Sequence, residues 1–421
     1  MKKLSLLTSA LIVAASFSFS VPAMAQVNIT DADRARIEER KNRKTQLPGE
    51  RVGRAVTKAY ELYSEEKIDE ALQVLQEVRG GNDFDNAFLA RFIGSLYASK
   101  DTKQAIKYLE QAVKSDLLSF SDHSASLRLV ADLQSMESMH KDSIKNYEAW
   151  MKFTGEQDPD VYLRVANAYY QLGDYKNVLT PIDNAIRYAK QPNKQYYMLK
   201  MGALYESKNY PKTVETVETM VQLFPEERQY WVYLGNFYTL VEDYQKSLSA
   251  LQIAYNNGYL QSESELKTLG QMYANNNIPH KAAAIYEKYM KSGKIKKDRT
   301  MLNAIASNFQ AAREFGKAAE YYGELAKMTN EADAYRRQGM AYLAIQKYND
   351  AIKAFDASLA IDSRDAGKIH MSLMEAYFYQ GKYREANAAL QAAKRDPATE
   401  RQTRSWQSYI NEKARVKNIS L

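Results

Sequence analysis

The stretch Trp231-Val232-Tyr233-Leu234-Gly235-Asn236-Phe237-Tyr238 decides how the chain folds. Its large apolar residues recur every three or four positions, which places them on one face of an α-helix, and Gly235 lies on the same face. A second apolar pattern with helical spacing follows at Tyr244, Ser247, Leu251 and Ala254. Because a glycine lets another helix approach closely, the stretch predicts two helices packed as a hairpin.

The same pattern recurs along the chain about every 35 residues. A small or short side chain stands in the second helix of each unit, at positions 71, 105, 143, 178, 213, 247, 282, 318, 351 and 386. Glycine or alanine recurs twelve positions earlier in several units, and an aromatic residue three positions earlier in six of them. No hairpin can bury its apolar face alone, so neighbouring hairpins must stack. The sequence therefore predicts an all-α stack of about ten hairpins.

These residues resemble the tetratricopeptide repeat, and the resemblance extends over residues 52–396. It implies an alpha-alpha superhelix, a solenoid whose first helices line a concave groove for proteins or extended peptides. Three units depart from the pattern. The third has Ser143 where alanine is usual, and the second and fifth lack one residue at the turn between their two helices when aligned with the others.

The first 25 residues have the features of a secretory signal peptide. Lys2 and Lys3 precede a run of apolar and small residues, and Ala23-Met24-Ala25 fits the small-x-small cleavage pattern. We expect cleavage after Ala25 and export to the periplasm of a Gram-negative bacterium, or full secretion. An uncleaved membrane anchor is disfavoured because serines interrupt the run and Pro22 ends it.

The repeats are flanked by two polar segments. Residues 26–51 are expected to form a lead-in arm, with a short helix capped near Thr30 that ends before Pro48, and an anion-binding arm is the alternative. Residues 397–421 are expected to form a capping helix and tail. That helix would begin at Pro397 and cover the last repeat with Trp406, Tyr409 and Ile410.

Composition and motifs give no sign of catalysis. The chain of 421 residues has no cysteine, and its four histidines show no metal-ligand spacing. Phosphate-binding loops and nucleophile motifs are absent from the sequence. The formal net charge of +7 is too mild for a dedicated nucleic-acid binder. We therefore expect no enzyme activity, no cofactor, no metal and no stable membrane insertion after signal cleavage.

What remains is a protein-binding surface. By the family's register, repeat positions 2, 5, 9 and 12 face the groove. The groove candidates are Asp160, Asn167, Tyr170, Tyr196, Glu206, Gln229, Asn236 and Thr239. The apolar residues Leu163, Leu199 and Val232 stand at groove-facing positions as well. In the family, asparagine at position 9 often bonds a ligand's backbone, which implies that role for Asn167 and Asn236. The alternative is that both are only polar groove-liners. Leu163 and Val232 stand where an acid-binding clamp needs lysine, so an acidic C-terminus is not the expected ligand.

The whole chain also resembles exported tetratricopeptide proteins encoded beside TonB energy-transduction clusters in marine gammaproteobacteria. The residues that carry this resemblance lie at 50–56, at 153–155 with 158–159, and at 278–283. It implies an accessory role in TonB-dependent uptake of ferric siderophores, through contact with periplasmic parts of the TonB complex. Two alternatives remain: an adaptor for envelope assembly, cell division or peptidoglycan machinery, and a regulatory subunit of an envelope enzyme. The sequence does not give the oligomeric state.

Overall fold

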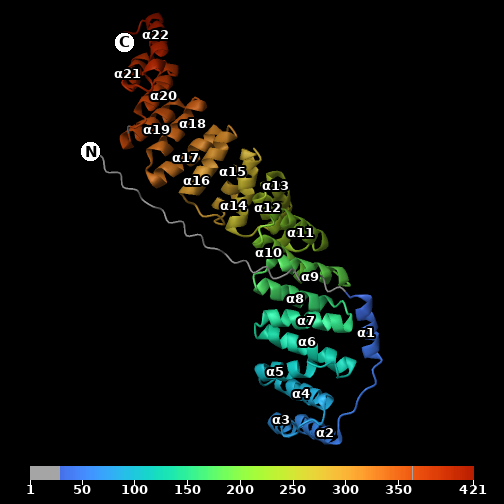
Figure 1. Ribbon diagram of the computed structural model, residues 1–421. Helices are drawn as coiled ribbons and strands as arrows, with labels where there is room; N and C mark the ends of the chain where they lie inside the picture. The colour runs from blue at the N-terminus through green and yellow to red at the C-terminus, as the bar shows by residue number, and fades with distance from the viewer. Residues whose placement is uncertain (1–28, 363) are drawn as a thin grey trace, which may run out of the picture. The chain divides into compact units, whose positions relative to one another are not determined.

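The computed structural model describes residues 29–362 and 364–421, and within them it contains 22 α-helices and no strand (Figure 1). The predicted signal peptide lies outside the described residues. The ten hairpins are α2 (Glu50–Ser64) with α3 (Ile68–Gln76), α4 (Asp83–Tyr97) with α5 (Thr102–Val113), α6 (Phe120–Met136) with α7 (His140–Thr154), α8 (Pro159–Gln171) with α9 (Tyr175–Tyr188), α10 (Lys194–Glu206) with α11 (Tyr210–Leu223), α12 (Arg228–Leu240) with α13 (Tyr244–Asn256), α14 (Glu263–Asn275) with α15 (Pro279–Lys291), α16 (Arg299–Ala311) with α17 (Phe315–Thr329), α18 (Ala332–Ala344) with α19 (Tyr348–Ile361), and α20 (Ala366–Tyr379) with α21 (Tyr383–Lys394). Helix α1 (Asp31–Lys41) precedes them and α22 (Glu400–Val416) follows. The predicted fold class, an all-α stack of hairpins with a terminal helix, is confirmed.

The chain divides into two compact units whose boundary falls between Thr216 and Val217, inside α11. Helices α1 to α10 belong to the first unit and α12 to α22 to the second. In each unit the core is a series of apolar clusters, formed where the second helix of a hairpin packs against its own first helix and the next one. Stacking thus buries the apolar faces that a lone hairpin would expose.

The small residue of the second helix is the most regular feature of the stack. In every hairpin it is the fourth residue of that helix, and in all ten its exposed fraction is 0%. Where it is serine, the hydroxyl bonds to the first helix: Ser143 Oγ donates to the Ala131 carbonyl at 3.0 Å, and Ser247 Oγ to the Gly235 carbonyl at 2.8 Å. Ser143 therefore fits the third hairpin without leaving a buried polar group unpaired.

Glycines in the first helices make room for a large side chain of the second. A Cβ added at Gly235 would lie 2.6 Å from Leu251 Cγ, and one added at Gly339 would lie 2.6 Å from the Phe355 ring. Such distances are too short for carbon atoms in contact. The close approach predicted for these glycines is therefore made to the residue four positions beyond the small one.

We expect Gly235→Leu to lower the free energy of unfolding by about 1–3 kcal/mol, because the new side chain would overpack the contact with Leu251. Chemical denaturation followed by circular dichroism measures this. Gly316→Ala is the matched control, since nothing lies within 4 Å of an added Cβ there. Equal stability of the Gly235→Leu variant and the parent would show that the hairpin contact lies elsewhere.

The terminal helix begins at Glu400, not at Pro397 as predicted. Residues before it form a turn, in which Thr399 Oγ1 donates to the Ala393 carbonyl at 2.6 Å. Of the three predicted covering residues, Ile410 is completely buried and Trp406 partly buried, whereas Tyr409 is 43% exposed. The helix packs on α21, and the rings of Trp406 and Tyr409 both contact Phe378 of α20.

Candidate protein-binding face

The predicted residues of α8 lie together on a surface shared with α10, which packs beside α8. Asp160 is exposed, and Asn167 and Tyr170 are half-buried. The Asn167 side chain makes no hydrogen bond in the part of the chain that the structure describes. An amide group has two donors and an acceptor, so Asn167 offers a ligand a full set of bonds.

The predicted register of the fifth repeat is wrong by one residue. Tyr196 is only 4% exposed and belongs to the core of the first unit, so it cannot form part of a groove. Helix α10 has the same length as α8, and three residues separate each of them from the next helix. The turn therefore lacks no residue. Counting from the helix starts, Gln195, Gly202 and Tyr205 are the counterparts of Asp160, Asn167 and Tyr170.

Tyr205, which the sequence reasoning missed, is 45% exposed. Glu206, which it named, is exposed one position further along α10. The sequence does contain a signal for the correct register. The small residue of each second helix stands twelve positions after position 8 of the first helix. Counting back from Thr213 reaches Met201 and makes Gly202 position 9.

Gly202 of α10 lies against a tyrosine ring of α8. A Cβ at Gly202 would lie 3.3 Å from Tyr170 Oη, so the Tyr170 ring reaches over the glycine. The same ring meets Tyr175 edge-on at 5.2 Å between centroids, and Tyr205 contacts Tyr210 at 6.0 Å. Burial, with the nearby Glu206 carboxylate, raises the pKa of Tyr170, so its hydroxyl stays protonated and can donate. We call the surface of Asp160, Asn167, Tyr170, Gly202 and Tyr205 the α8–α10 face.

In the second unit, two of the predicted groove residues are exposed on α12. Gln229 donates to Tyr233 Oη at 2.6 Å, and Asn236 makes no side-chain hydrogen bond among the described residues. Thr239 is already engaged: its hydroxyl donates to the Gly235 carbonyl at 2.9 Å and lies 2.8 Å from Ser247 Oγ. Val232 is 8% exposed and packs in the core. Val232 and the Thr239 hydroxyl therefore serve the fold, contrary to the prediction, and Asn236 is the available polar group.

Arginines near the α8–α10 face are paired with carboxylates. Arg128 Nη1 lies 2.7 Å from Asp158 Oδ2, and Arg164 Nη1 lies 3.4 Å from Asp132 Oδ1. The guanidinium of Arg128 also lies over the Trp150 ring. Leu163 is half-buried on the same helix. The α8–α10 face presents the rings of Tyr170 and Tyr205, the Asn167 amide and the Asp160 carboxylate.

The basic segment 291–299 is largely paired as well. Lys291 contacts Glu287 at 2.6 Å, Lys297 contacts Glu324 at 2.8 Å, and Arg299 contacts Glu331 at 2.7 Å. These pairs tie the link between two hairpins to its neighbours. Residues 29–362 and 364–421 contain no group of three or more acidic or histidine side chains arranged to hold a metal ion. In the same residues, no helix is both long and apolar enough to cross a membrane.

Residues 303–366 match the family model of the tetratricopeptide repeat, a stretch that spans the hairpins α16–α17 and α18–α19. No curated protein matches the sequence. Among solved structures, the chain is similar to the C-terminal part of a tetratricopeptide-repeat-containing protein from Cytophaga hutchinsonii, with 15% identity and a TM-score of 0.36 over 56% of this chain and 95% of that one.

Two further solved structures are similar at the same level. YrrB, described as a tetratricopeptide protein with an unusual peptide-binding site, has 14% identity and a TM-score of 0.35, covering 48% of this chain and 97% of its own. The TPR2AB domain of yeast Sti1, solved in a complex with pHSP90, has 16% identity and a TM-score of 0.35, covering 61% of this chain and 99% of its own.

Proposed function

We propose that this stack of tetratricopeptide-type hairpins is a non-enzymatic scaffold that binds a segment of a partner protein on its α8–α10 face. The observation that carries the proposal is the unbonded amide of Asn167, a half-buried residue one helical turn from Leu163 and from Tyr170 on α8. Because this amide reaches solvent and bonds to no protein group among the described residues, it is available to a peptide backbone.

The chemistry of the face suits an extended segment. The Asn167 amide can donate to a backbone carbonyl and accept from a backbone N–H at the same time. Tyr170 and Tyr205 offer broad ring surfaces with a polar end, the kind of side chain enriched at protein interfaces. Gly202 has no side chain, which leaves room for the Tyr170 ring to lie over α10. A partner would thus be held by backbone bonds at the amide and by side-chain packing on the rings.

Asn167→Ala is expected to weaken partner binding by about 1–3 kcal/mol, because a desolvated hydrogen bond is lost, and to leave the fold unchanged. Asn236→Ala, in the other unit, receives the same test separately. Titration of the purified partner, identified by pull-down, measures both. Lys176→Ala on the exposed side of α9 is the matched control and should bind like the parent. Full affinity for the partner in both variants would show that Asn167 and Asn236 only line the groove.

We further propose that the scaffold is exported and serves TonB-dependent uptake of ferric siderophores. The signal-peptide features of residues 1–25 support export. The resemblance at residues 50–56, 153–155 with 158–159, and 278–283 supports the TonB assignment. The mature protein should begin at Gln26 when it is isolated from periplasm.

Growth of a deletion strain separates the cellular roles. If the scaffold serves TonB-dependent uptake, the strain should grow poorly on a ferric siderophore and normally on freely available iron. Normal growth on both, with defects in cell shape or division, would favour an envelope-assembly or peptidoglycan adaptor. A loss of one envelope enzyme's activity that the purified chain restores would favour a regulatory subunit.

A further inference from the structure

Helix α1 lies on the third hairpin although it precedes the first. It packs against α7, and residues 42–49 then lead back along the stack to α2 (Figure 1). A capping helix would cover α2 and α3 at the open end of the first unit. Because α1 passes over two hairpins to reach α7, its position is not explained by capping.

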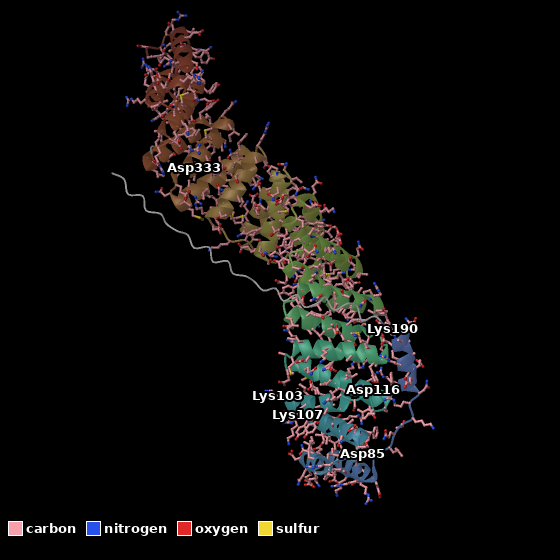
Figure 2. All side chains as sticks on the ribbon, viewed as in Figure 1. Asp85, Lys103, Lys107, Asp116, Lys190 and Asp333 are labelled. Atoms are coloured by element: carbon pink, nitrogen blue, oxygen red, sulfur yellow. The ribbon has the colours of Figure 1, made fainter. Side chains whose placement is uncertain are left out.

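A small number of contacts hold α1 in place. Ile37 is its only buried residue, at 5% exposure, and its Cδ1 faces Gly155, where an added Cβ would lie 3.0 Å away. Arg40 Nε lies 2.6 Å from Asp116 Oδ2, and Arg43 Nη1 lies 3.0 Å from Asp116 Oδ1 and 2.6 Å from its backbone oxygen. Figure 2 shows Asp116 on the side of the unit where α1 lies. Asp116 thus receives both of these arginines in one small charge network, which is only partly exposed.

The surface beneath α1 is aromatic and already formed. The Phe153 ring stacks on Phe120 at 5.3 Å and on His123 at 4.4 Å between centroids, and the Arg40 guanidinium lies 4.5 Å above the Phe153 ring. His123 is 5% exposed, and its Nδ1 has no hydrogen-bond partner among the described residues. We call Asp116, Phe120, His123, Phe153 and Gly155 the α1 seat.

Residues 42–49 form the tether between α1 and α2, and its middle part is loosely held. Side chains 44–47 make no hydrogen bond or ion pair in the described part of the chain, and Leu47 is 83% exposed. At the far end of the tether, the Gly49 N–H donates to the buried Asp85 carboxylate at 2.9 Å, which fixes the start of α2. Release of α1 would therefore leave the first hairpin anchored.

We propose that the α1 seat is a helix-docking site, distinct from the α8–α10 face, and that α1 is a tethered occupant which a partner helix must displace. The partner is an amphipathic helix that presents an aliphatic residue followed three positions later by an arginine, as Ile37 and Arg40 do in α1, with a second arginine just beyond the helix end, as Arg43 is here. The aliphatic side chain packs at Gly155, one guanidinium lies over Phe153, and both arginines bond to Asp116. Charge complementarity with Asp116 selects arginine, since a planar guanidinium can both stack on a ring and bond a carboxylate.

A synthetic peptide with the sequence of residues 29–46, carrying a fluorescent label, is the probe for this site. The full chain with Ile37→Asp and Arg40→Ser has its own α1 undocked and its seat intact. We expect the peptide to bind this variant at least tenfold more tightly than the parent. In the parent, the tether holds α1 at an effective concentration in the millimolar range, against which the free peptide must compete.

Two controls keep the result specific. Adding Asp116→Asn to the undocked chain should weaken peptide binding at least tenfold, whereas adding Asp142→Asn, an exposed carboxyl on α7, should not. A peptide carrying the Ile37 and Arg40 changes should not bind. Equal binding to parent and undocked chains would place the peptide elsewhere, and no binding to an undocked chain of unchanged helicity would show that the seat does not accept a helix in trans. Either result overturns the proposal and leaves the Asn167 test unaffected.

Discussion

Lowering the pH from 7 to 4.5 is expected to reduce the free energy of unfolding of the first unit by about 2.5 kcal/mol through His123 alone. Burial lowers the pKa of His123 from 6.5 to about 4, and the nearby Arg40 and Arg43 add to the shift while Asp116 opposes it. A folded-state pKa below the unfolded one means that the unfolded chain binds the proton more tightly. The stabilisation is therefore complete above pH 6.5 and is lost as the pH falls toward 4.

The fluorescence of Trp150, buried in the first unit, reports this transition once Trp231 and Trp406 are replaced by phenylalanine. Urea titrations at the two pH values give the change in stability. In the same background, His123→Phe keeps an aromatic ring against Phe153 and removes the titrating group, so its stability should fall much less. A fall as large as that of the parent would assign the acid sensitivity to other groups.

Removing residues 397–421 is expected to destabilise the last hairpin by about 2–4 kcal/mol and to make the chain aggregate. The deletion takes away the completely buried Ile410 and the rings of Trp406 and Tyr409 that cover Phe378. The apolar surface of α20 and α21 then faces water. Thermal melting and sedimentation velocity measure the two effects.

A single substitution distinguishes the loss of the side chains that cover the last hairpin from the shortening of the chain. Ile410→Asp places a charge in the buried contact and should reproduce most of the loss, whereas Ser408→Asp on the exposed side of α22 should behave like the parent. If the truncated chain is as soluble and as stable as the parent, α22 is not a cap and is available for binding.

The stacking of the hairpins could be predicted because a local pattern in each repeat indicates it. A small residue recurs at the fourth position of each second helix, and that position is completely buried in all ten hairpins. Close packing of two helices leaves no other solution there. Even Ser143, an exception in the sequence, fits because its hydroxyl finds a carbonyl of the partner helix.

The binding face was predicted less well, for two physical reasons. In the fifth repeat, Met201 takes the position where most repeats have glycine or alanine, and the neighbouring Gly202 shifted the alignment by one residue. On α12, the helical period placed Val232 and Thr239 on the free face, but a half-buried face also packs against the next hairpin. Burial of these side chains depends on neighbours that are distant in sequence.

The seat of α1 could not be predicted at all from local patterns. Its contacts join residues far apart, such as Arg40 and Asp116, which are 76 positions apart. The sequence did indicate a short helix capped at Thr30, and the capping box with Asp33 is present. Nothing in the spacing of charged residues indicates which hairpin such a helix selects.

Site-specific photo-crosslinking in living cells tests whether a partner protein binds on the α8–α10 face. A photoreactive amino acid is placed at Asn167, at Tyr205, or at Lys176 on the exposed side of α9. We predict that the photoreactive group at Asn167 and at Tyr205 crosslinks to the same partner, and that the group at Lys176 does not. Crosslinking of that partner through Lys176 but not through Asn167 or Tyr205 would contradict it.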